Sequence, residues 1–274
     1  MLMVALAAGV LGGIYYFGVY QPKEYTKQVS RFYEDLKSHE QNLGSIRSGV
    51  KSNNDYQNTT LSLNAIDQFL SEQEAKLNKI KPPLFGPGKK FHEDFQVLFK
   101  SYHQAIDEGK RRAEFMVKAK ELEDVMSPKT SQTLDPTSAK VKDLQQFYNK
   151  RISAMKQAGN NLFTDGQMPN LTEVSYDELK TAWEQADPSF DTLWAVVRSL
   201  DPNAPLDPSL LQPQLESGQA KEAGDRINSF NKLLKAVIDN NTAPDILSLS
   251  SSSQSFQQLE QKIQELQKRY FGGR

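Results

Sequence analysis

The chain has 274 residues, of which 33 are lysine or arginine and 34 are aspartate or glutamate, so its net charge is −1. This balance makes no case for nucleic acid as a partner, because nucleic-acid binding needs a basic surface. No cysteine is present, which excludes disulfides, thiolate nucleophiles, iron–sulfur clusters and zinc sites with cysteine ligands.

The first twenty residues, MLMVALAAGVLGGIYYFGVY, carry no charged side chain. About 20 apolar residues are what one helix needs to cross the hydrocarbon core of a bilayer. Residues 1–20 therefore predict a transmembrane helix, with the lipid bilayer as its partner. The alternative is a cleaved signal peptide, but no basic residue precedes the apolar run, and aromatic residues fill the end where cleavage needs small ones. We interpret the segment as a retained signal-anchor that ends in an interfacial aromatic belt.

Small residues lie on one face of this predicted anchor. Ala5, Gly9 and Gly13 are four residues apart, and this spacing lets two transmembrane helices approach closely. Glycine is also common in membrane helices in general, so pairing through this face is a hypothesis.

Two features of the sequence disagree about which side of the membrane the chain after the anchor occupies. Lys23, Lys27, Arg31 and Lys37 follow the anchor, and the positive-inside rule then favours a cytoplasmic position for the rest of the chain. Linkers rich in serine, threonine, asparagine and glutamine, together with the absence of cysteine, are typical of an extracytoplasmic domain. A short basic segment ahead of Met1 would favour the same orientation. We expect a single-pass membrane protein. We favour an extracytoplasmic location for the bulk of the chain over a cytoplasmic one.

Residues 21–160 are predicted to form a bundle of four antiparallel helices. Apolar residues recur at alternating spacings of three and four, which is the seam pattern of coiled-coil and bundle helices. The first two seams are expected at Tyr25, Val29, Phe32, Leu36, His39, Leu43, Ile46 and Val50, and then at Leu63, Ile66, Leu70, Gln73, Leu77 and Ile80.

A stiff turn, PPLFGPG, separates the second and third predicted helices. Its tip residues Leu84 and Phe85 are expected to cover the end of the bundle, and the alternative is an exposed contact loop. Gly109 weakens the middle of the third helix, where it indicates a kink, a break or a close crossing of another helix.

Residues 161–274 are predicted to form a smaller helical domain with proline-rich turns and a C-terminal amphipathic helix. Ser175 and Glu178 fit a capping box that opens one helix, and Asp187-Pro188 is expected to open the next. The final seam runs through Phe256, Leu259, Ile263, Leu266 and Tyr270.

Both tryptophans of the chain, Trp183 and Trp194, belong to this second domain and are eleven residues apart. One interpretation is a small core that needs large side chains. The other is an aromatic cleft, in which the two rings form a ligand or partner surface for a peptide or glycan.

We predict no catalytic, cofactor-binding or metal-binding residue. His92 and His103 are eleven residues apart on one predicted helix, too far apart to bind a single metal ion. The sequence contains no nucleophile elbow, P-loop, dinucleotide fingerprint or EF-hand loop. We therefore expect a non-enzymatic, membrane-anchored scaffold or adaptor, whose helices bind a protein partner or a second copy of the chain. The alternative is an extracytoplasmic ligand-binding bundle that uses the region of Trp183 and Trp194.

Overall fold

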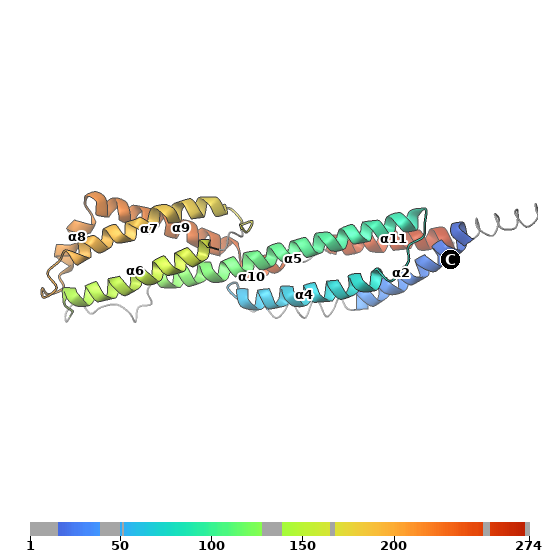
Figure 1. Cartoon of the computed structure of the whole chain (residues 1–274), viewed down its shortest axis with the longest axis horizontal. Helices are drawn as coiled ribbons and strands as arrows, with labels where there is room; N and C mark the ends of the chain where they lie inside the picture. Colours follow the sequence, from blue (N-terminus) through green and yellow to red (C-terminus); the bar gives the residue numbers. More distant parts are fainter. Residues whose placement is uncertain are drawn as a thin grey trace, which may run out of the picture. The chain divides into compact units, whose positions relative to one another are not determined.

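The computed structural model of the chain describes residues 16–38, 50, 52–127, 139–164, 168–248 and 253–271. These residues form helices and one isolated β-bridge, with no strand among them, so the predicted all-α class is confirmed. The chain divides into two compact units, which are described separately (Figure 1). Unit 1 comprises Met1–Lys110 and Pro244–Arg274, and unit 2 comprises Arg111–Ala243.

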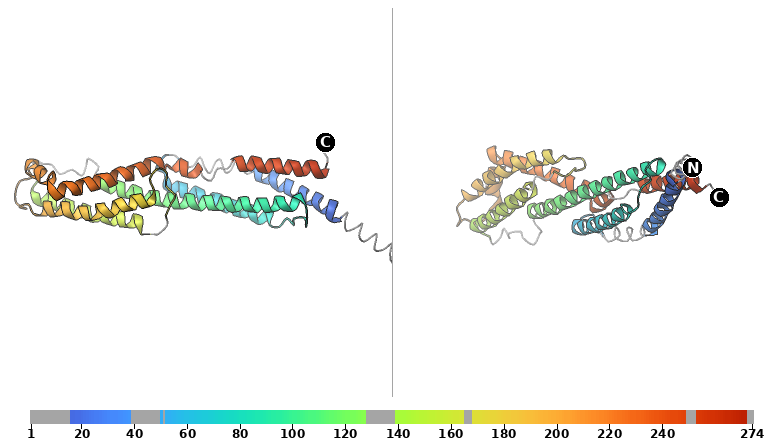
Figure 2. Two further views of the ribbon diagram at one scale, coloured as in Figure 1. Left: turned by 90° about the horizontal axis from the view of Figure 1, so that it is seen from above. Right: turned by 45° about the vertical axis from the view of Figure 1, so that its right-hand side comes forward.

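Unit 1 is a bundle of long helices around an aromatic and aliphatic core. Its elements are η1 (Tyr16–Tyr20), α2 (Gln21–Ser38), α4 (Tyr56–Leu77), the first part of α5 (Pro87–Met126), most of α10 (Ala243–Ser248) and α11 (Ser253–Phe271). Within this unit α4 lies along α5, and α11 returns beside α2 (Figure 1, Figure 2). The predicted seam residues that lie in this core are Tyr25, Val29, Phe32, Leu63, Ile66, Leu70, Leu77, Ile263 and Leu266. From α5 the core also receives Phe91, Phe95 and Ile106. Residues 39–49, which carry the predicted seam from His39 to Ile46, lie outside the described part of the chain.

The connection between α4 and α5 presents its tip to solvent. α4 ends at Leu77, five residues before the first proline of the turn. Gly86 has a φ of 88°, a left-handed conformation that glycine adopts without a steric cost. The side chains of Leu84 and Phe85 are 54% and 73% exposed. The expectation that they cover the end of the bundle is therefore wrong, and the alternative of an exposed loop is what the structure shows.

Gly109 marks a close crossing rather than a break, because α5 continues through it. A Cβ atom at this position would lie 3.1 Å from Cδ1 of Leu63 and 3.7 Å from the carbonyl oxygen of Ile246. The missing side chain lets α4 and α10 approach α5 at this point.

Unit 2 combines the second part of α5 with α6 (Val141–Phe163), α7 (Tyr176–Arg198), α8 (Pro208–Leu215) and α9 (Gly218–Asn240). The guanidinium of Arg151 donates a hydrogen bond of 2.6 Å to the carbonyl oxygen of Met126, and thereby satisfies one of the open carbonyls at the end of α5. The start of α6 is held by the connection between α7 and α8, since the Val141 amide donates to the Ala204 carbonyl oxygen at 3.1 Å.

The start of α7 is as predicted, but its interior is not. The Ser175 hydroxyl accepts a hydrogen bond of 3.1 Å from the Glu178 amide, which is the expected N-cap. Pro188, however, does not open a new helix, because α7 runs through it to Arg198. Burial of Trp183 and Phe190 on either side of the proline offsets the loss of one helical hydrogen bond.

The two units do not follow the predicted division into residues 21–160 and 161–274. The difference has two physical causes. α5 is one continuous helix that contributes to both units, and the C-terminal helix α11 packs in unit 1, where the Gln267 amide donates to the Ser30 hydroxyl at 2.9 Å. A seam pattern shows that a helix face is buried but not which helix covers it.

Most of the predicted anchor at residues 1–20 lies outside the described residues, since the structure describes only Tyr16–Tyr20 of it. In the part of the chain that is described, no helix combines the length and the apolar composition needed to cross a bilayer. The transmembrane helix therefore stays a prediction from the sequence.

Candidate functional site

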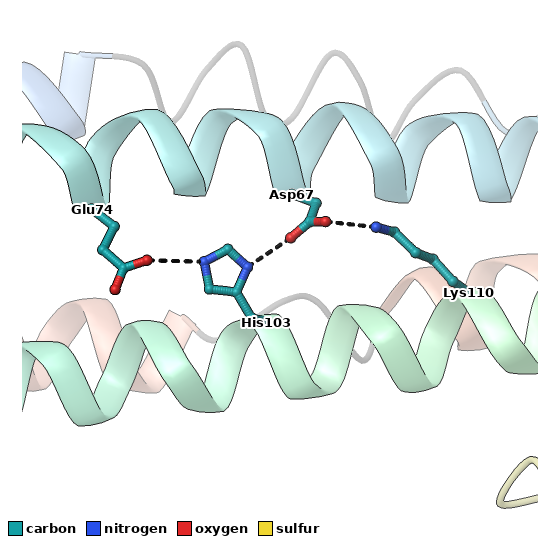
Figure 3. Close-up of polar contacts among 4 residues, drawn as sticks. All are labelled: Asp67, Glu74, His103 and Lys110. Carbon is teal, nitrogen blue, oxygen red and sulfur yellow. Dashed lines mark hydrogen bonds and ion pairs between the residues drawn. The ribbon is translucent and has the colours of Figure 1, made fainter.

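Four polar side chains from α4 and α5 meet in unit 1: Asp67, Glu74, His103 and Lys110 (Figure 3). His103 lies between the two carboxylates, with Nδ1 at 2.7 Å from Oδ1 of Asp67 and Nε2 at 3.4 Å from Oε2 of Glu74. The Lys110 ammonium donates to the second oxygen of Asp67 at 2.6 Å. We refer to these four residues as the His103 cluster.

The local sequence explains why these groups meet. Asp67 and Glu74 are seven residues apart on α4, and His103 and Lys110 are seven apart on α5. A separation of seven places two side chains two turns apart on one face of a helix. Because the helices are antiparallel, acidic and basic groups alternate along their contact (Figure 3).

The environment of the cluster keeps Asp67 ionised. Its side chain is 27% exposed, and that of Lys110 is 20% exposed. Burial on its own raises the pKa of Asp67, but hydrogen bonds and charges from Lys110 and His103 outweigh it and hold this pKa below its usual value. The carboxylate is therefore a fixed negative charge at neutral pH.

The cluster joins α4 and α5 through hydrogen bonds and ion pairs. Both ring nitrogens of His103 face carboxylates, and both oxygens of Asp67 are engaged. Among the described residues, no group of three or more histidine, aspartate or glutamate side chains is arranged to hold a metal ion. A polar contact of this kind within a bundle seam specifies the register of the two helices.

A second histidine, His92, has a different partner in the same unit. Its Nδ1 lies 3.3 Å from the Tyr25 hydroxyl of α2, and its side chain is 6% exposed. Burial lowers the pKa of His92 and raises that of Tyr25, so both groups are neutral at physiological pH. His92 and His103 thus make separate contacts with different helices, His92 with α2 and His103 with α4.

A cavity of about 520 Å³ lies between the start of α5 and the end of α11. Its lining combines the apolar Phe91 and Leu266 with charged residues of both signs. Lys262 and Asp94 form an ion pair of 2.6 Å across it, which joins the two helices. A hydrogen bond and the charge of Lys262 lower the pKa of Asp94, so the Asp94 carboxylate is ionised at neutral pH.

The structure places the two tryptophans differently. Trp183 is 4% exposed and packs against the rings of Phe163, Phe190 and Phe230, with centroid distances of 6.3, 5.9 and 5.2 Å. Trp194 is half-buried, and in the described part of the chain no ring contact joins it to Trp183. The ring of Trp183 is thus a core element of unit 2, which leaves Trp194 as the more accessible of the two predicted surface residues.

The predicted pairing face, Ala5, Gly9 and Gly13, lies outside the described residues. The aromatic end of the predicted anchor is described. Tyr16, Phe17 and Tyr20 of η1 are 49%, 43% and 52% exposed, and the rings of Tyr16 and Tyr20 stack at 5.6 Å.

The His103 cluster was not predicted from the sequence. Its signal was present as two pairs of polar residues seven apart, on the margins of two apolar seams. Each pair alone is typical of a solvated helix face, and only the register of α4 against α5 brings them together.

No protein-family model, no curated protein and no solved structure matches the chain.

Proposed function

We propose that the chain is a single-pass, membrane-anchored helical scaffold or adaptor, which acts through protein–protein interaction and not through catalysis. The observation that carries this proposal is the exposed aromatic turn Tyr16–Tyr20, which joins an uncharged apolar leader directly to the first bundle helix.

The leader supports an anchor by its length and by its end. Residues 1–20 are free of charge and long enough for one crossing of a bilayer. Exposed tyrosine and phenylalanine side chains are what the interface between lipid and water favours, because their rings are apolar and the tyrosine hydroxyl is polar. The three exposed rings of η1 fit that position.

The way the leader joins the bundle supports a scaffold. α2 begins at Gln21, immediately after η1, and Val29 and Phe32 of α2 are 1% and 7% exposed. Within the described residues 16–38, η1 continues into α2 without an intervening loop, and α2 buries one face in unit 1. An anchor in the membrane would therefore hold unit 1 at a fixed position relative to the bilayer.

We further propose that the bulk of the chain is extracytoplasmic. The test is protease accessibility in intact cells and in opened cells, with an antibody to an epitope at the C-terminus and a cytoplasmic protein as control. We expect protease to degrade the chain in intact cells while the cytoplasmic control survives. Survival of the chain in intact cells, with degradation only after the cells are opened, would place the bulk in the cytoplasm.

Self-association through Ala5, Gly9 and Gly13 is part of the same proposal. Replacement of Gly9 and Gly13 by leucine places large side chains where two helices would approach. We expect this variant to lose association in a membrane two-hybrid assay, whereas replacement of Leu6 and Val10 by alanine should retain it. Equal signals from both variants would exclude pairing through this face.

A further inference from the structure

Three segments of unit 1 that are distant in sequence meet at one end of the bundle. These are the start of α2, the connection between α4 and α5, and the end of α11 (Figure 1, Figure 2). A Cβ atom at Gly86 of the connection would lie 3.7 Å from the Tyr270 hydroxyl of α11. The Lys23 ammonium of α2 lies 5.9 Å from the ring centroid of Phe271. The predicted anchor enters the bundle at this same end, since η1 directly precedes α2.

Large apolar side chains are exposed on each of these segments. Phe85 is 73% exposed, more than any other large apolar side chain of the described residues, and its neighbour Leu84 is 54% exposed. Tyr20 and Phe271 are each 52% exposed. On either side of Leu84 and Phe85, Pro83 is buried and Gly86 adopts a left-handed φ. Exposure of this kind at one end of a bundle is typical of an interaction surface.

Basic side chains surround these apolar residues. Lys79 and Lys81 belong to the connection, and Lys268 and Arg269 to the last turn of α11; all four are exposed. Among the described residues, no ion pair involves any of them. Lys90, at the start of α5, differs in this respect, because it forms an ion pair with Asp94 at 3.5 Å. Glu24 of α2 and Glu265 of α11 are likewise in no ion pair among the described residues, so the four basic side chains leave a net positive unpaired charge at this end of the bundle.

We propose that this end patch, made of Leu84, Phe85, Phe271 and the four unpaired basic residues, docks on a bilayer surface that contains anionic phospholipid. The proposal rests on the proposed membrane anchor, since the leader would bring the patch to the bilayer. Leu84 and Phe85 enter the boundary between headgroups and acyl chains, and the basic side chains lie at the level of the lipid phosphates. Charge complementarity selects anionic over zwitterionic lipid.

The absence of cysteine from the chain allows a direct test. A nitroxide is attached to a single cysteine in the variant Phe85→Cys, and the full chain is reconstituted into vesicles of phosphatidylcholine alone or mixed with phosphatidylglycerol. Electron paramagnetic resonance then compares the access of oxygen, which enters lipid, with the access of a water-soluble nickel complex. The matched control is Leu61→Cys, on the exposed face of α4, where the native side chain is 65% exposed.

We expect the label at position 85 to become severalfold less accessible to the nickel complex in the anionic vesicles, with little change at position 61. A second variant replaces Lys79, Lys81, Lys268 and Arg269 by glutamine, and this change should abolish the effect. Its control replaces four exposed lysines of unit 2 by glutamine, namely Lys142, Lys150, Lys221 and Lys235. Equal nickel access at positions 85 and 61 in the anionic vesicles would overturn the docking of the end patch.

An alkaline carbonate wash of the same vesicles separates this inference from the anchor. If the chain is retained and the label at position 85 is exposed to water, the result supports the anchor and overturns the docking of the end patch. Release of the chain by carbonate, when the label was lipid-immersed before the wash, supports the patch and overturns the anchor.

Discussion

A Cβ atom at Gly159 would lie 2.0 Å from Cζ2 of Trp183, so the indole ring lies directly against the backbone of α6. No real Cβ atom occupies such a position, and neither the backbone of α6 nor the ring, which Phe163 and Phe230 enclose, has room to move aside. The pair fixes the distance between α6 and α7 in unit 2.

We therefore expect Gly159→Ala to lower the free energy of unfolding of unit 2 by about 1–3 kcal/mol or more. The control is Gly224→Ala on α9, where a Cβ atom meets nothing within 4 Å. That change should be neutral or stabilising by up to about 1 kcal/mol, because alanine has the higher helix propensity. Chemical unfolding followed by tryptophan fluorescence measures both, because the two tryptophans, Trp183 and Trp194, belong to unit 2. A neutral Gly159→Ala would show that the indole ring can be displaced at little cost.

His92 makes the stability of unit 1 depend on pH. Burial lowers its pKa in the folded chain, and the charge of Glu93 opposes this only in part. The unfolded chain, with an ordinary pKa of about 6.5, therefore binds the proton more readily. The contribution to stability is fully present above that pH and is lost as the pH falls toward the folded pKa, with a slope of at most about 1.4 kcal/mol per pH unit.

The variant His92→Gln should flatten this slope, because glutamine does not titrate and still offers a polar partner to the Tyr25 hydroxyl. Urea unfolding at a series of pH values below 7 gives the slope for both proteins. Identical slopes would show that protonation of His92 does not oppose folding.

The ion pair of Asp67 and Lys110 also makes stability fall as the pH falls, but it does so in a more acidic range, below about pH 4. The pKa of Asp67 is lowered in the folded state, so its contribution is present above the ordinary value of about 3.9 and is lost as the pH falls through the folded value. We expect Asp67→Asn to cost about 1–2 kcal/mol at pH 7 and nearly nothing in strong acid. The control is Asp107→Asn, an exposed carboxylate on α5. An equal cost for both variants at pH 7 would remove the His103 cluster from the forces that join α4 and α5.

The sequence predicted the individual helices well and their arrangement poorly. The seam of α4 is an example: Leu63, Ile66 and Leu70 are 0%, 1% and 3% exposed, as their spacing indicates. Gln73 is buried with them, as a seam position requires. Periodicity reports the environment of a helix face, and these faces are deeply buried.

The arrangement depends on contacts between residues that are distant in sequence, for which the pattern carries no signal. α11 packs on α2 and α5, and the His103 cluster exists only in one register of α4 against α5. Pro188 shows a related limit. Proline is a strong local signal for the start of a helix, but packing of Trp183 and Phe190 overrides it.

The docking of α11 in unit 1 leads to a further prediction. Ile263 and Leu266 are each 4% exposed, so replacement of either by alanine leaves a cavity and should cost about 2–5 kcal/mol. Hydrogen exchange should then increase along α11 and along the facing part of α2, and remain unchanged in α7 and α9. Gln264→Ala, on the exposed face of α11, is the control. Unchanged exchange in Ile263→Ala would mean that α11 is held by its polar contacts alone.

The membrane anchor is tested most directly by alkaline carbonate extraction of cell membranes. The native chain is compared with a variant in which Val10 and Leu11, at the middle of the leader, are both replaced by arginine, a change that opposes insertion by about 5–7 kcal/mol. We predict that the native chain remains in the membrane pellet and that the arginine variant is released to the supernatant. Release of the native chain by carbonate would contradict the anchor.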